Sequence, residues 1–191
     1  MKSLKLFFIQ LLFVPGMLFA QSGIYMNAGD YSAGHLSYAV NCDSAAGKIR
    51  LNHFLAKKYV NVIQGNKKIQ LKKDSIFGYR NCVGKEYRFF KNNDQEFQIV
   101  ENKTIVIYIA DVPVVSTTGK TGQMVPHYFF SITLGSDIFP LTLIDLKMAF
   151  PGNIKFHDLL DVEFNNSKDI SAYDTGHKMY RVNYLASQSV N

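Results

Sequence analysis

The sequence predicts an α+β fold: an antiparallel β-meander followed by two or three short C-terminal helices. From about residue 36 to residue 133 apolar and polar residues mostly alternate, as strands with one buried face require. After Gly135-Ser136-Asp137 the apolar spacing changes to three and four residues, which is typical of helices. Strands first and helices last favour an antiparallel sheet over a parallel one. Because a long meander must protect its edges, we expect a partly closed barrel or roll.

The expected strands follow one another in hairpins. Ile49 and Leu51 alternate with charged or polar neighbours, which indicates a half-buried strand. Gly65-Asn66 predicts a two-residue turn, placed between a strand around Val60 and Val62 and a strand at 68–72. Further strands are expected at 76–79, 86–90, 97–100, 104–109, 112–117 and 125–133.

The expected helices begin after residue 141. Thr142 followed by Asp145 resembles a capping box that opens a helix ending at Ala149. The spacing of apolar residues predicts a second helix from Ile154 to Phe164. From Thr175 to Ala186 we expect a helix capped by Asp174, although Tyr180, Val182 and Tyr184 also alternate as in a strand.

The first twenty residues have the layout of a secretory signal peptide. Lys2 and Lys5 precede an apolar run from Leu6 to Val14, and Leu18-Phe19-Ala20 leads into a polar segment. The apolar run is shorter than the roughly 20 residues that span a bilayer. We therefore expect cleavage after Ala20, a periplasmic or secreted location, and a mature chain without a transmembrane segment. Residues 21–191 are expected to form a single domain, mainly strands over about 36–133 and mainly helices over 141–186.

Positive charge is concentrated in one segment. Residues 48–91 contain twelve Lys or Arg against Asp74 and Glu86, a balance of +10, whereas residues 92–191 carry −4. On the expected strands Lys48 and Arg50 share one outward face, and Lys68 and Lys72 share another. Aligned on adjacent strands, these side chains would form a positive patch that attracts an anionic glycan or lipopolysaccharide. No nucleic-acid motif is present. Alternatively, these lysines keep an exposed sheet soluble and block edge pairing.

Cys42 and Cys82 are the two cysteines of the chain. An even number of cysteines in an exported protein permits a disulfide. Each cysteine stands where an expected strand gives way to a turn containing glycine. The sequence does not decide between a Cys42–Cys82 bond and two separate thiols, because it gives no distance between them.

One set of residues suggests catalysis. His157 and Asp161 lie four residues apart on the second expected helix and share a face, and Asp174 and His177 could supply further ligands. This hypothesis describes a metal-dependent hydrolase or acid–base enzyme. Against it, His157 stands near the start of a helix, where polar residues satisfy free backbone N–H groups. Gly119-Lys120-Thr121 is not a phosphate-binding loop, because the position five residues before the Gly-Lys pair is Val114.

The sequence therefore favours a non-enzymatic binding or structural module, and predicts neither a cofactor nor a bound metal. The segments that carry a family resemblance are 75–80, 87–89, 150–153 and 155–161. With them the chain resembles, over most of its mature length, a group of uncharacterised exported proteins of Bacteroidota. This resemblance implies provenance without implying an activity. Asp43-Ser44-Ala45 and Asp74-Ser75-Ile76 also resemble the short acceptor pattern of periplasmic O-glycosylation in that phylum, while Asp43 and Ser44 equally fit an ordinary turn.

Overall fold

The computed structural model describes residues 21–44, 47–51, 58–90, 93–114, 122–164 and 169–189. The predicted signal peptide, residues 1–20, and the Gly119-Lys120-Thr121 turn lie outside these ranges. Within them, no helix has the length and apolar character needed to cross a lipid bilayer.

The larger sheet has eight strands in the order β11-β10-β9-β8-β7-β6-β1-β2, and every neighbouring pair is antiparallel. From β6 to β11 the strands follow chain order, so the predicted meander and the α+β class are confirmed. The described strands form an open sheet whose edges are β2 and β11, rather than a closed barrel. The strands are β1 Gln21–Tyr25, β2 Ser37–Asn41, β6 Gly78–Arg80, β7 Glu86–Phe90, β8 Asn93–Asn102, β9 Val106–Pro113, β10 Met124–Ser131 and β11 Phe139–Pro140.

The first strand departs from the simple meander. β1 begins directly after the predicted cleavage site and lies between β6 and β2. Four of its five residues are buried, so it lacks the alternation that identifies a half-exposed strand. A short helix, α1 Ala28–Ala33, connects β1 to β2; the side chain of Asn27 caps its start and Gly34 ends it in a left-handed conformation.

A second, three-stranded sheet is formed by β3 Gly47–Arg50, β4 Tyr59–Gln64 and β5 Lys67–Lys72. The predicted turn at Gly65-Asn66 joins β4 to β5, and Gly65 has the positive φ of 57° that such a turn requires. A 3-10 turn, η1 Lys73–Ser75, leads from β5 back towards β6.

Two of the predicted C-terminal helices are confirmed. Thr142 accepts a hydrogen bond from the Asp145 N–H and so caps α2 Leu143–Ala149, and α3 spans Ile154–Phe164. The third helix starts later than expected: α4 spans Arg181–Ser189. Residues 175–178 form a turn between the short strands β12 Tyr173–Asp174 and β13 Met179–Tyr180. The Asp174 side chain accepts from the His177 N–H in that turn, so it cannot cap α4.

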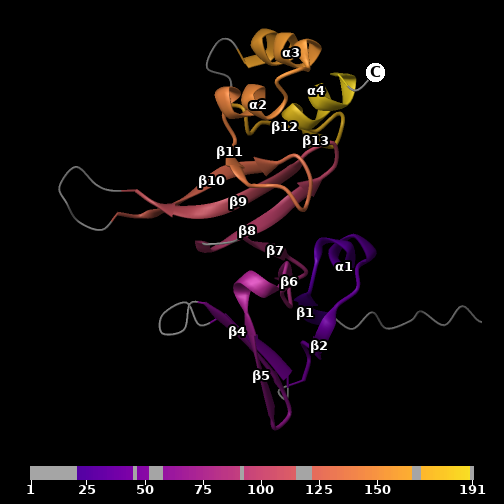
Figure 1. Cartoon of the computed structure of the whole chain (residues 1–191), viewed down its shortest axis with the longest axis vertical. Coiled ribbons are helices and arrows are strands. Elements are labelled where there is room, and N and C mark those ends of the chain that lie inside the picture. Colours follow the sequence, from indigo (N-terminus) through magenta and orange to yellow (C-terminus); the bar gives the residue numbers. More distant parts are fainter. Residues whose placement is uncertain are drawn as a thin grey trace, which may run out of the picture.

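Three apolar clusters form the core of the part of the chain that the structure describes. The largest lies between β9–β10 and helices α2–α4, and its fully buried members include Phe130, Leu146, Phe156 and Leu160. A second joins the three-stranded sheet to β1, β2, β6 and β7. The third, around Phe97 and Tyr108, belongs to β8 and β9. In Figure 1 the helices α2–α4 lie at one end of the molecule and β4–β5 at the other, with β8–β10 between them.

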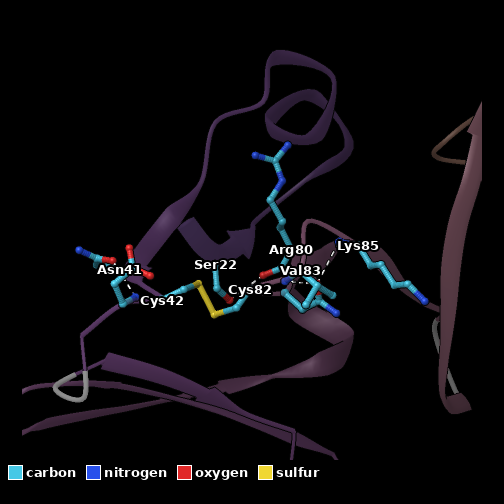
Figure 2. Close-up of a disulfide and its surroundings, with 9 residues drawn as sticks. Ser22, Asn41, Cys42, Arg80, Cys82, Val83 and Lys85 are labelled. Atoms are coloured by element: carbon cyan, nitrogen blue, oxygen red, sulfur yellow. Dashed lines mark hydrogen bonds between the residues drawn. A yellow bond between two sulfur atoms is a disulfide. The ribbon is translucent and has the colours of Figure 1, made fainter. Parts of the chain in front are cut away.

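The Cys42–Cys82 disulfide is present, with 5.5 Å between the two Cα atoms. Cys42 follows β2 and Cys82 follows β6, and these are the two strands that flank β1. The bond therefore ties the neighbours of β1 together beside its first residues (Figure 2). Next to it, the Ser22 hydroxyl donates to the Arg80 carbonyl over 2.6 Å.

Candidate functional site

The three-stranded sheet places all four predicted basic residues on one face. In the ladder, Lys48 lies opposite Ile63 and Ile63 opposite Lys68. Directly opposed residues project to the same side of a sheet, as do residues two apart along a strand. Arg50 and Lys72 therefore share the face of Lys48 and Lys68, and all four residues are exposed. We call Lys48, Arg50, Lys68 and Lys72 the basic face.

The other side of this sheet is apolar and packs against the rest of the molecule. Ile49, Val60, Val62, Ile69 and Leu71 belong to the second core cluster. This packing determines which side of the sheet faces outwards, because a shift of one residue in register would bury the charges. The orientation of the basic face thus follows directly from the alternating pattern in the sequence.

The four charges lie close enough for their fields to add. Strands β3 and β5 are separated by β4 alone, which places their backbones about 10 Å apart. That separation is comparable with the Debye length, about 8 Å at physiological ionic strength. The sequence contains no Asp or Glu between Asp43 and Asp74, so no acidic residue of these strands neutralises the basic face. At its centre Gln70 donates to the Asn61 side chain over 3.3 Å.

Two of the predicted catalytic residues have separate partners. The ring Nε2 of His157 lies 2.9 Å from the Phe150 carbonyl oxygen at the end of α2. Because a carbonyl only accepts, this contact requires Nε2 to carry the proton. Asp161 forms an ion pair with Lys147. Both contacts join α3 to α2, and the start of α3 is capped by Asn153 rather than by His157.

The other two catalytic candidates pair with each other. The His177 ring Nδ1 lies 2.9 Å from one carboxylate oxygen of Asp174, and the His177 backbone N–H donates to the other. The hydrogen bond from the His177 side chain is the main cause that lowers the pKa of Asp174 to about 2. In the part of the chain that the structure describes, no three His, Cys, Asp or Glu side chains are arranged to hold a metal ion. The enzyme hypothesis stays a prediction from the sequence.

Two cationic side chains, Lys73 and Arg88, are buried among the described residues, and no local sequence pattern indicates this. The buried Lys73 side chain forms an ion pair with Glu96 over 3.2 Å, and Tyr79 donates to the same carboxylate over 2.8 Å. Burial, followed by the charge of Glu96, raises the pKa of Tyr79. Arg88 on β7 is also buried, with 6% of its surface exposed. Its burial depends on β9 and the loop after β10, which no local pattern reveals.

Lys73 and Arg88 line one cavity of about 410 Å³, which we call the junction cavity. Its wall comes from the β1–α1 connection, η1, β7 and the loop that follows β10. Apolar lining residues include Phe77, Phe89, Phe90 and Leu134. The exposed carboxylates of Asp74 and Asp137 line it as well. Its size is within the range of small-molecule sites.

The two serines that resemble glycosylation acceptors both lie in turns. Ser75 is exposed at the end of η1, and its hydroxyl donates to the Lys72 carbonyl over 2.8 Å. Ser44 follows β2, and its backbone N–H donates to the Asn41 carbonyl. Modification of either serine stays a prediction.

Comparison with known proteins gives no relative from which a function could be transferred. No protein-family model, no curated protein and no solved structure matches the chain.

Proposed function

We propose that the protein is an exported, non-enzymatic module that binds an anionic component of the cell envelope through its basic face. One observation carries this proposal: the strand register aligns Lys48, Arg50, Lys68 and Lys72 on one exposed face without an acidic residue in the same strands. Export is supported by the layout of residues 1–20 and by the disulfide, since disulfides persist in oxidising compartments.

The ligand class follows from the arrangement of the charges. Four cations in two rows suit a partner that presents several anionic groups at once, such as an acidic glycan or the phosphates of lipopolysaccharide. Because the four residues are exposed, the attraction is electrostatic and screened by salt. Each basic residue next to an anionic surface contributes about 1 kcal/mol, so binding depends on several residues rather than on one.

Binding of the purified protein to lipopolysaccharide and to polygalacturonate, measured over a series of NaCl concentrations, tests the proposal. We expect affinity to fall steeply as salt rises. The double variant Lys48→Gln/Lys68→Gln should weaken binding roughly thirtyfold, at about 1 kcal/mol for each charge removed.

The matched control is Lys155→Gln/Lys178→Gln, which removes the same charge from two exposed residues of the C-terminal half. This control should bind nearly as well as the unmodified protein. Equal losses in both double variants would show a general charge effect and would contradict a specific basic face. Binding that does not respond to salt would contradict the proposed electrostatic attraction.

A further inference from the structure

Among the residues that the structure describes, the Arg88 guanidinium is a buried charge with unusual surroundings. One terminal nitrogen, Nη1, donates to the Tyr108 hydroxyl over 3.0 Å and lies 3.5 Å from the Ser131 hydroxyl. The other, Nη2, donates to the Ser136 carbonyl over 2.8 Å. All three partners are neutral. Within the described residues, no carboxylate lies within 4 Å of this guanidinium.

A buried charge without a counter-ion is costly, and arginine cannot lose its proton to avoid that cost. The ring centroids of Phe77, Phe90 and Tyr108 lie 5.7–5.9 Å from the guanidinium carbon, Cζ. Cation–π contacts with these rings offset part of the cost of burying the charge. Lys73, which is also buried among the described residues, differs because it has Glu96 as its counter-ion. A guanidinium has five N–H donors. The contacts with Tyr108, Ser131 and Ser136 therefore leave two N–H groups of Arg88 without a hydrogen-bond partner among the described residues.

These donors belong to a residue that lines the junction cavity. We propose that the junction cavity binds a small organic monocarboxylate, whose carboxylate pairs with Arg88 and whose apolar body lies against Phe77, Phe90 and Leu134. The planar guanidinium matches a carboxylate in a paired, two-bond geometry. This site is separate from the basic face and does not depend on the proposed function.

The acidic residues of the cavity narrow the ligand class. Asp74 and Asp137 are exposed lining residues, so a second anionic group on the ligand would face two carboxylates of the same sign. Aromatic and aliphatic lining residues favour an uncharged, apolar body of modest size. A ligand with a single charged end meets both conditions.

Calorimetric titration with phenylacetate and with phenylacetamide tests the inference directly, because the two probes share an aromatic body and differ in charge. We expect one phenylacetate per chain, bound at least tenfold more tightly than the amide. Binding should also survive 0.5 M NaCl, since buried ion pairs are screened much less than exposed ones. Persistence in salt separates this site from the basic face, whose binding should be lost under the same conditions.

Two variants assign the effect to Arg88. Arg88→Lys keeps the charge but loses the two-bond geometry. It should lower the affinity for phenylacetate at least tenfold and leave the affinity for phenylacetamide unchanged. Arg80→Lys is the control, because Arg80 lies on the adjacent strand β6 and is paired with Glu86 outside the cavity. Equal affinity for acid and amide, absence of phenylacetate binding, or an unchanged affinity in Arg88→Lys would each overturn the proposal.

Discussion

The described residues of the N-terminal region (21–90) and of the C-terminal region (93–189) are held together by different interactions. The C-terminal region packs three helices against β9 and β10 around the largest apolar cluster. The N-terminal region has a smaller apolar cluster, and it adds the disulfide and most of the positive charge of the chain. Apolar packing thus stabilises both regions, and the N-terminal region adds a covalent link and carries the exposed cations.

This difference predicts where mutations should change stability and where they should change binding. Both candidate ligand surfaces depend on cations from the N-terminal region: the basic face entirely, and the junction cavity through Lys73 and Arg88. The cavity lies where the two regions meet, because Leu134, Gly135 and Asp137 belong to the loop that follows β10.

The largest loss of stability is expected in the C-terminal core. Phe156 on α3 is fully buried in the largest cluster, and Phe156→Ala should lower the free energy of unfolding by about 3–5 kcal/mol through lost burial and an unfilled cavity. Urea unfolding measures this change. On the same helix, Val162 is 75% exposed, and Val162→Ala should stay within about 0.5 kcal/mol. Similar losses in both variants would contradict the packing described for α3.

The N-terminal counterpart is the disulfide. Cys42 and Cys82 are 40 residues apart in the sequence, and closing a loop of that length stabilises by about 4 kcal/mol on the chain-entropy model. The double variant Cys42→Ser/Cys82→Ser should lose up to this amount in urea unfolding. Reductant should destabilise the unmodified protein and leave the variant unchanged. A loss below about 1 kcal/mol would show that apolar packing alone holds β2 and β6 beside β1.

A smaller loss is expected at the contact between α4 and the β8–β9 turn. Asn183 is fully buried; its side chain accepts from the Ile105 N–H over 2.8 Å and donates to the Ile105 carbonyl over 3.1 Å. Asn183→Ala leaves both backbone groups without that partner and should cost about 3 kcal/mol. Thermal unfolding of this variant and of Gln188→Ala, an exposed position on α4, provides the comparison. Equal melting temperatures would contradict the role given to Asn183.

The smallest expected effect on stability is that of replacing Asp174, and it depends on pH. Its pKa is lowered from the ordinary value of 3.8 to about 2 by the hydrogen bond from His177. A carboxyl group whose pKa is lower in the folded state stabilises the fold above its unfolded pKa and loses that contribution as pH falls through the folded pKa. The melting-temperature difference between the unmodified protein and Asp174→Asn should therefore shrink between about pH 4 and pH 2. A difference that does not change with pH would contradict this interpretation.

The elements that could be predicted from the sequence are those that residues close together in the chain determine. The Thr142 cap, the bounds of α3 and the Gly65-Asn66 turn each depend on neighbouring residues, and each is present. The position of β1 could not be predicted in this way, because its partners are Arg80 and Asn41, far along the chain. The start of α4 was predicted wrongly because the Asp174 side chain bonds within a turn instead of capping a helix.

The two candidate sites differ in the same way: one depends on local sequence patterns and the other on residues far apart in the chain. Within β3 and β5, basic and apolar residues alternate, and this pattern is visible in the sequence. The Gly65-Asn66 turn fixes the register of β5 against β4. Together these two features produce the basic face. The junction cavity could not be inferred, because Arg88 occupies an unremarkable position on a short strand. Its distinctive surroundings come from Tyr108, Ser131 and Ser136, which other strands and loops bring to it.

The comparison between the two regions is tested most directly by mapping where an acidic glycan binds. Amide correlation spectra of the ¹⁵N-labelled protein should be recorded during titration with oligogalacturonate at low salt. We predict that the largest shifts occur at the amides of Lys48, Arg50, Lys68 and Lys72 and reverse when NaCl is added. Shifts concentrated on α2, α3 and α4 would contradict the account.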